Sequence, residues 1–246
     1  MKSKGKKFLI GCSGYYYRTW KEKFYNNAPA SQWLEEYSKV FNTVELNGTF
    51  YKVPVLKNLK KQAKQTPPGF KFSVKANRYV THILRLKNSK KENETFENLM
   101  LKGLGNKLEK ILFQMPPGFH YKEETLEAIE KNIADSELNA VEFRHISWWN
   151  ETVFDFFKSR KIVFCNPDFP GLQPAFVASG NNFYLRLHGV PKLFASNYTE
   201  KRLKEIANQL PGDCKTYCIY FNNDAKGHAY ENAQSLKKII DPKFAK

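Results

Sequence analysis

The segment AVEFRHISWW (residues 140–149) sets an apolar face against a charged face. Side chains alternate between the two faces of a β-strand, so Val141 and Phe143 share one face while Glu142 and Arg144 share the other. A half-exposed strand could leave its charged face in water. The rest of the chain predicts instead that this face looks into a pocket.

Eight short strand-like runs alternate with amphipathic helical runs along the 246 residues, a pattern typical of a parallel sheet. No linker rich in Pro, Gly or Ser divides the chain, which predicts one domain over residues 1–246. Eight βα units in a chain of this length indicate an α/β fold, a single TIM-like (β/α)8 barrel. The predicted strands are 8–12, 43–47, 71–75, 111–114, 140–144, 162–166, 183–188 and 216–222.

Helices are expected between these strands, where apolar residues recur three and four positions apart. One begins after the N-cap candidate Ser31, another follows Thr199, and the last spans about Ala229 to Ile240. The connection after the sixth strand, FPGLQPAFVASG (169–180), is broken by prolines. It is therefore expected to be short or irregular.

The same alternation predicts which polar side chains point toward the barrel axis, near the C-terminal strand ends where such barrels carry their chemistry. Each of these groups would cost about 1–3 kcal/mol if it were buried without a partner, so together they need mutual pairing or a ligand. The predicted inward residues are Glu45, Asn47, Lys75, Gln114, Glu142, Arg144, Asn166, Arg186, His188 and Asn222.

The inward charges comprise two carboxylates and three cations, which predicts a net positive site. Guanidinium groups match phosphate or carboxylate bidentately, so the expected substrate is an anion. The loop at 222–227 precedes the last helix, where barrels often bind phosphate. The predicted substrate-binding residues of the strand ends are Asn47, Lys75, Gln114, Arg144, Arg186 and Asn222.

Metal-free acid–base chemistry of the hydrolase or lyase type would use Glu45 or Glu142 as general acid or base, with His188 as its partner. Tyr15, Tyr51 and Trp148 are expected at the mouth, where they could stack on a base or sugar ring.

A metal-dependent nuclease or sugar isomerase is an alternative, with Glu45, Glu142, Asp168 and His188 as the available ligands. The three inward cations would repel a divalent ion at the same mouth, so we expect no metal and no cofactor.

The net charge of +16 favours anionic partners, either a phosphate-bearing small molecule or nucleic acid. Lysines scattered over exposed helix positions would give the same excess for solubility alone. The chain contains no apolar run of about 18 residues, so no membrane span is expected. The apolar run at residues 8–10 is too short for a signal peptide, and we expect a cytoplasmic protein whose four cysteines are reduced.

Several segments resemble, in order, the family known as domain of unknown function 72, also called YecE-like. They include GCSGYYYRTW (11–20), ELNGTFYKVP (45–54), VEFRHISWW (141–149), YLRLHG (184–189) and YCIYFNNDAKGHAYENA (217–233). The resemblance implies a TIM-barrel-like fold and brings no established reaction. We expect an enzyme acting on a phosphorylated or nucleic-acid-like anionic substrate. The alternative is a non-catalytic protein that binds nucleic acid or an anionic small molecule.

Overall fold

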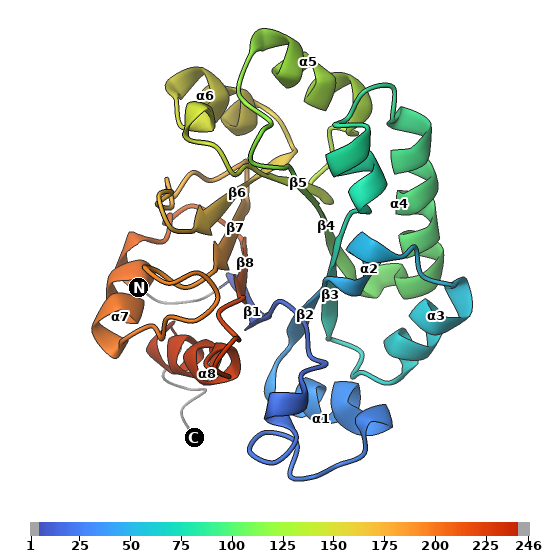
Figure 1. The fold of residues 1–246 in the computed structure, drawn as a ribbon, viewed down its shortest axis with the longest axis vertical. Coiled ribbons are helices and arrows are strands. Elements are labelled where there is room, and N and C mark those ends of the chain that lie inside the picture. The colour runs from blue at the N-terminus through green and yellow to red at the C-terminus, as the bar shows by residue number, and fades with distance from the viewer. Residues whose placement is uncertain (1–4, 241–246) are drawn as a thin grey trace.

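The computed structural model describes residues 5–240 and shows eight parallel strands in a nearly closed TIM-like barrel (Figure 1). All eight predicted strands are confirmed. The expected domain limits at residues 1 and 246 lie outside the described residues. The strands are β1 (Lys7–Cys12), β2 (Thr43–Leu46), β3 (Lys71–Lys75), β4 (Leu108–Gln114), β5 (Asn139–Glu142), β6 (Val163–Asp168), β7 (Asn182–Leu187) and β8 (Thr216–Phe221).

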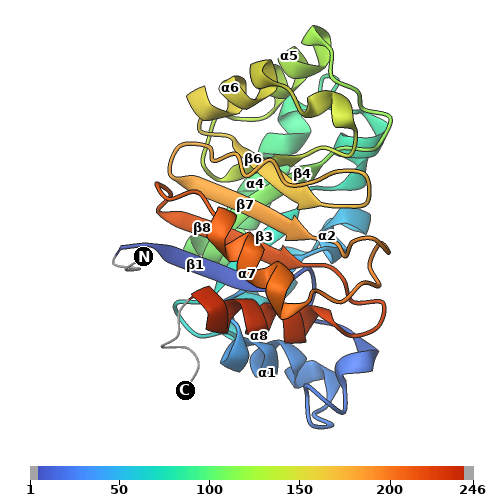
Figure 2. The same ribbon diagram turned by 90° about the vertical axis from the view of Figure 1, so that its left-hand side faces the viewer.

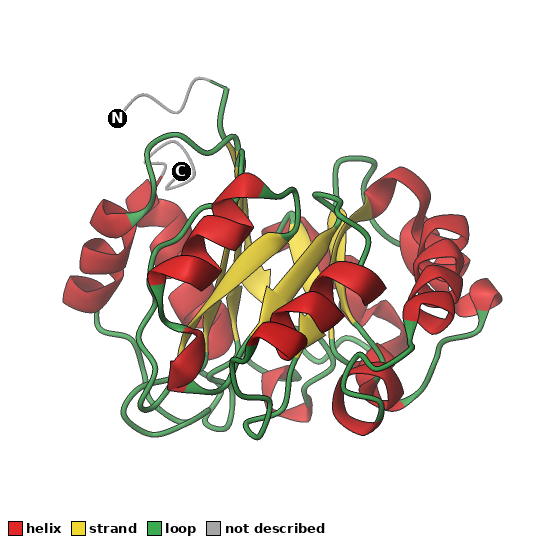
Figure 3. Ribbon diagram, turned by 90° about the horizontal axis from the view of Figure 1, so that it is seen from above, coloured by secondary structure: helices red, strands yellow, loops and turns green. Residues whose placement is uncertain are grey.

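The helices surround the strands (Figure 3), and in the side view α7 and α8 lie over β7, β8 and β1 (Figure 2). The α-helices are α1 (Trp33–Val40), α2 (Gly48–Tyr51), α3 (Leu56–Lys64), α4 (Lys90–Leu104), α5 (Glu123–Asn132), α6 (Glu151–Ser159), α7 (Glu200–Gln209) and α8 (Ala229–Ile240). Short turns of helix lie at η1 (Arg18–Trp20), η2 (Ala30–Gln32), η3 (Tyr79–Ile83), η4 (Gly105–Lys107) and η5 (Ile146–Trp148). Between residues 5 and 240, no helix has the length and apolar character needed to cross a membrane.

One of the two predicted helix starts is confirmed. The Thr199 side chain accepts a hydrogen bond from the Arg202 amide and caps α7. Ser31 caps no helix, so that prediction was wrong. Pro29 precedes the single turn η2, which contains Ser31, and α1 begins only at Trp33.

The connection between β6 and β7 contains no helix in the described chain, as its prolines predicted. The Asn166 side chain holds this extended segment, because its amide accepts from the Val177 N–H and donates to the Val177 carbonyl, both at 3.0 Å. Asn166 therefore faces outward, and its predicted inward orientation was wrong. The backbone N–H and C=O groups of an extended segment need hydrogen-bond partners outside that segment, whereas a helix pairs its own backbone groups. Asn166 supplies such partners for Val177.

The barrel has a seam, because β1 and β2 stand at the two ends of the strand order β1-β8-β7-β6-β5-β4-β3-β2. The Tyr37 hydroxyl bridges the seam: it accepts from the Cys12 amide at 2.8 Å and donates to the Thr43 carbonyl at 3.0 Å. A Cβ on Gly11 would lie 2.3 Å from that carbonyl oxygen, so this approach requires glycine.

The inside of the barrel below the mouth is filled by a small core, separate from the larger core between the sheet and the helices. The four cysteines are free and buried, as expected for small packing residues. The inner core comprises Leu9, Leu112, Ala140, Val163, Cys165, Tyr184, Cys218 and Tyr220. Above this core, at the C-terminal ends of the strands, the polar side chains gather.

Candidate functional site

A cavity of about 550 Å³ opens at the C-terminal ends of the strands. Residues from β3, β4 and β7, and from the segments that follow β2, β5 and β8, meet at its wall. The structure thus brings together seven of the predicted substrate-binding residues, which are Asn47, Tyr51, Lys75, Gln114, Arg144, Arg186 and Asn222.

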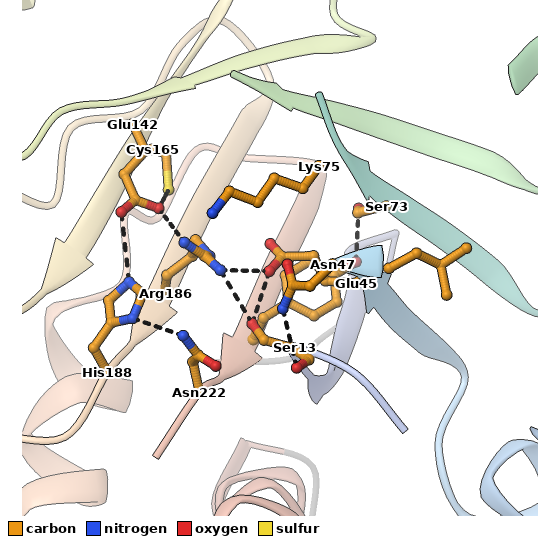
Figure 4. A network of polar contacts seen from close by, with 12 residues as sticks. Ser13, Glu45, Asn47, Ser73, Lys75, Glu142, Cys165, Arg186, His188 and Asn222 are labelled. Atoms are coloured by element: carbon orange, nitrogen blue, oxygen red, sulfur yellow. Dashed lines mark hydrogen bonds and ion pairs between the residues drawn. The ribbon is translucent and has the colours of Figure 1, made fainter. Parts of the chain in front are cut away.

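Arg186 lies at the centre of a buried ion-pair network (Figure 4). Its two terminal nitrogens donate to different carboxylates, one to Glu45 Oε1 at 2.7 Å and one to Glu142 Oε2 at 2.6 Å. Arg144 pairs with the other oxygen of Glu142. Both carboxylates are fully buried and belong to strands on different parts of the barrel wall. The network therefore holds both guanidinium groups through carboxylates that do not line the cavity.

Glu45 accepts two further hydrogen bonds. Ser13 Oγ donates to Oε1 at 2.7 Å, and the Tyr184 hydroxyl donates to Oε2 at 2.6 Å. Burial alone would raise the pKa of Glu142, but the Arg144 and Arg186 guanidinium groups hold that pKa well below its usual value. Carboxylates held in this way do not favour the general acid or base role predicted for Glu45 and Glu142.

His188 is buried beside the same network, with Nε2 3.1 Å from an Arg144 nitrogen and 3.5 Å from Glu142 Oε1. Its Nδ1 lies 3.1 Å from the Asn222 amide. Burial, followed by the nearby Arg144 and Arg186 charges, lowers the pKa of His188 to about 3. The imidazole is therefore neutral at pH 7, and it orients Arg144 and Asn222.

Lys75 is the third inward cation, and it projects from the end of β3 toward the network (Figure 4). Its Nζ lies 4.0 Å above the Phe50 ring. Burial, together with the Arg186 charge, lowers the pKa of Lys75 to about 8. Lys75 is thus a cationic wall residue that loses its proton near physiological pH.

Asp224 lines the cavity too, and sequence reasoning placed it only within the phosphate-loop candidate at 222–227. One carboxylate oxygen accepts from Trp20 Nε1 at 2.8 Å. Burial raises the pKa of Asp224 to about 6. Its position two residues after Asn222, beyond a strand end, was the available signal, but its burial depends on Trp20, which is remote in sequence.

Aromatic residues around the mouth differ from the prediction in two places. Trp148 is fully buried, with its ring stacked on Phe143 at 3.8 Å between centroids and its Nε1 donating to Phe119, so it does not line the mouth. Its predicted stacking role was wrong, because η5 turns the ring toward the outer face of the sheet. Tyr15 lines an adjoining cavity of about 530 Å³ instead.

Three exposed aromatic residues line the main cavity. Tyr51 is 75% exposed, Tyr16 is 61% exposed and Phe194 is 41% exposed. Sequence reasoning selected only Tyr51 for this role. The run of three tyrosines at 15–17 signalled an aromatic wall, but it did not show which ring faces which cavity.

Within residues 5–240, no group of three or more His, Cys, Asp and Glu side chains is arranged to hold a metal ion. Asp168, a candidate ligand, has its Oδ1 3.7 Å from Arg202 on α7.

Known proteins match both the sequence and this fold. A family model described as protein of unknown function DUF72 matches residues 9–246. UPF0759 protein YunF of Bacillus subtilis (strain 168) is 28% identical over 247 residues, which cover 86% of this chain and 88% of that protein.

Two crystal structures of DUF72 family proteins share the architecture. The one from Thermotoga maritima MSB8 has a TM-score of 0.83 and 30% identity, covering 95% of this chain and 99% of that chain. The one from Enterococcus faecalis V583 has a TM-score of 0.76 and 18% identity, covering 95% of each chain, and supports the fold alone.

Proposed function

The chain belongs to the DUF72 family of proteins of unknown function, and we propose that it is an enzyme that acts on a phosphate-bearing substrate at the barrel mouth. This proposal rests on the positions of the charged groups relative to the cavity. The carboxylates of Glu45 and Glu142 lie behind Arg144 and Arg186, so the cavity wall presents guanidinium groups. Guanidinium groups held in fixed positions bind phosphate with little loss of side-chain entropy.

Other cavity residues indicate the kind of molecule that would carry the phosphate. Arg18 adds a further cation at the wall. The exposed rings of Tyr16, Tyr51 and Phe194 offer stacking surfaces for a base or a sugar. A phosphorylated sugar or a nucleotide-like molecule therefore fits the cavity better than a simple carboxylate does.

Asp224 is the acid–base residue that the cavity itself supports. Its pKa of about 6 lies close to physiological pH, as efficient proton transfer requires. Glu142 stays ionised and His188 stays neutral at that pH, so neither exchanges a proton readily. This assignment replaces the metal-free roles that the sequence predicted for Glu45, Glu142 and His188.

Binding of inorganic phosphate tests the anion site. Phosphate at about 100 times its dissociation constant should stabilise the folded protein by roughly 2.7 kcal/mol, seen as a higher Tm. The double variant Arg18→Gln/Arg144→Gln should lose most of this increment. A matched control, Lys60→Gln/Lys61→Gln on the exposed face of α3, removes the same charge and should keep it. An unchanged increment in the Arg18 and Arg144 variant would place the anion elsewhere.

Catalysis is tested separately from binding, with a panel of phosphorylated sugars and nucleotides. Turnover of a panel member should be lost in Asp224→Asn, while stabilisation by phosphate is retained. A protein that binds phosphate but turns over no member of the panel would support the alternative, a non-catalytic binder of anions.

A further inference from the structure

Lys75 differs from the other two inward cations in having no carboxylate partner. Arg144 and Arg186 both form ion pairs with Glu142, and Arg186 also forms an ion pair with Glu45. Among residues 5–240, the Lys75 Nζ forms neither a hydrogen bond nor an ion pair. Figure 4 shows the side chain ending beside the network without a contact drawn to it. Its amine is therefore free to meet a ligand in the cavity that it lines.

The surroundings of Lys75 shift its protonation equilibrium toward the neutral amine. The side chain is partly buried against the Phe50 ring, and the guanidinium groups of Arg144 and Arg186 line the same cavity. Burial and the charge of Arg186 lower the pKa of Lys75 to about 8, so about a tenth of the molecules carry a neutral amine at pH 7. Desolvation and a neighbouring cation are the usual means of making a lysine nucleophilic.

We infer that Lys75 is a catalytic nucleophile whose Nζ forms an imine with an aldehyde or ketone carbon of the phosphate-bearing substrate. This inference rests on the proposed function, because the anion site would deliver the carbonyl group to the amine. Arg144 and Arg186 would hold the phosphate, while the carbonyl carbon lies against β3. The substrate class is thereby narrowed to phosphorylated carbonyl compounds.

The chemistry balances without an oxidant or reductant. The neutral Nζ adds to the carbonyl carbon, a C–N bond forms, and the carbonyl oxygen takes up a proton to give a carbinolamine. The nitrogen gives up one proton as the carbinolamine forms. The carbinolamine hydroxyl then takes up a proton and leaves as water as the C–O bond breaks, which gives a protonated imine that withdraws electrons from the neighbouring carbon. Bond cleavage or proton removal at that carbon becomes easier, and hydrolysis of the imine returns Lys75 and releases the product. Asp224, which lines the same cavity, would exchange the protons.

Pyridoxal 5′-phosphate is a suitable probe, because it carries an aldehyde, a phosphate and an aromatic ring in one molecule. The full chain is incubated with one equivalent of this probe, the imine is reduced with borohydride, and the labelled peptide is identified by mass. We expect one label per chain on Lys75, at least tenfold less label with pyridoxal, and competition by inorganic phosphate. The rate of labelling should rise through pH 8, whereas exposed lysines react only at higher pH.

Lys75→Met removes the amine and keeps the length of the side chain, and it should abolish the label. Lys71→Met is the matched control, because Lys71 lies on the same strand at the opposite end of the barrel and should leave labelling unchanged. Labelling spread over other lysines, or labelling that survives in Lys75→Met, would overturn the inference. So would the absence of any label.

Phosphate binding separates failure of this inference from failure of the proposed function. If phosphate raises the Tm but Lys75 is not labelled, then the anion site stands and Lys75 is only a cation of its wall. If phosphate does not raise the Tm, the proposed function fails as well.

Discussion

At the scale of single residues, the site rests on one guanidinium group placed between two buried carboxylates. A buried ion pair contributes little net stability, since desolvation offsets much of the Coulomb attraction. Its consequence here is geometric: Glu45 and Glu142 fix Arg186 from two strands, and His188 and Glu142 fix Arg144. The carboxylates therefore hold the two arginines in position, and the arginines line the cavity.

Removal of Arg186 is predicted to be costly because it leaves two buried carboxylates without their shared partner. Arg186→Met should lower the free energy of unfolding by about 3–5 kcal/mol, measured by urea denaturation. Arg160→Met breaks an exposed pair with Glu130 and should cost about 1 kcal/mol or less. Adding Glu142→Gln to Arg186→Met should recover part of the loss. A loss below about 1 kcal/mol in Arg186→Met would mean that water or other groups compensate the carboxylates.

Asp224 gives a prediction for the pH dependence of stability. Its pKa is about 6 in the folded state, above the unfolded value, so the folded state holds the proton more tightly. The folded state is therefore favoured at low pH, and Asp224 reduces stability as the pH rises from about 4 to about 6. Allowing for solvent screening, this reduction amounts to about 1–2 kcal/mol.

The measurement compares urea denaturation of the wild type and of Asp224→Asn at several pH values. The asparagine can still accept from Trp20 Nε1 but does not titrate. The wild type should lose stability relative to the variant between pH 4 and pH 7. A constant difference over that range would show that Asp224 titrates normally in the folded protein.

At the scale of secondary-structure elements, the alternation of side chains predicted most of the site. It placed Glu45, Glu142, Arg186 and His188 on one inner surface, because parallel strands of a barrel share that surface over their whole length. It failed at Asn166, where the helix after β6 is missing and an extended segment changes which face of the strand needs polar groups. The alternation of side chains along one strand cannot show that an extended segment, rather than a helix, packs against that strand.

The loops limited prediction more than the strands did. Trp148 lies shortly after β5, but a single turn of helix carries its ring to the outer core rather than to the mouth. Asp224 owes its altered pKa to burial that includes a contact with Trp20, more than 200 residues away. Roles that depend on loop conformation or on distant partners could not be predicted from spacing alone.

The seam between β1 and β2 gives a prediction for these two elements. Tyr37→Phe removes the hydroxyl that serves the Cys12 amide and the Thr43 carbonyl, so it should cost about 1–3 kcal/mol of unfolding free energy. Tyr217→Phe, which loses a bond to the partly exposed Pro211 carbonyl at the other end of the barrel, should cost less. Faster exchange of the Cys12 amide hydrogen in Tyr37→Phe would locate the effect at the seam. Equal losses of unfolding free energy in the two variants would show that the Tyr37 bridge contributes no more than an ordinary tyrosine hydrogen bond.

At the scale of the whole molecule, the barrel divides its charge between two regions. The mouth holds a fixed group of cations backed by carboxylates, while the remaining excess of lysine is spread over the outer helices. In the connection after β3, burial and then the charges of Lys75, Arg78 and Arg85 lower the pKa of His82 to about 4. A small phosphorylated ligand would use the mouth, whereas a polyanion would also contact this connection.

The net charge of +16 attracts nucleic acid, but no base-reading motif is present in the sequence. Binding should be non-specific and electrostatic. Contact with about six phosphates would weaken the affinity by about a thousandfold between 50 and 200 mM salt. Fluorescence anisotropy with duplex and single-stranded oligonucleotides at several salt concentrations measures this slope.

Two charge-reversal variants distinguish binding near the mouth from binding over the outer helices. Arg78→Glu/Arg85→Glu changes the connection beside the mouth, and Lys60→Glu/Lys61→Glu makes the same change of net charge on α3. Similar weakening in both variants would support diffuse attraction by the whole surface. A larger loss of affinity in the Arg78 and Arg85 variant would instead indicate that the nucleic-acid chain runs from the mouth over this connection. An affinity independent of salt would contradict the electrostatic prediction. Without binding at 50 mM salt, the lysine excess would act on solubility, and the proposal of a small phosphorylated ligand at the mouth would be favoured over nucleic acid.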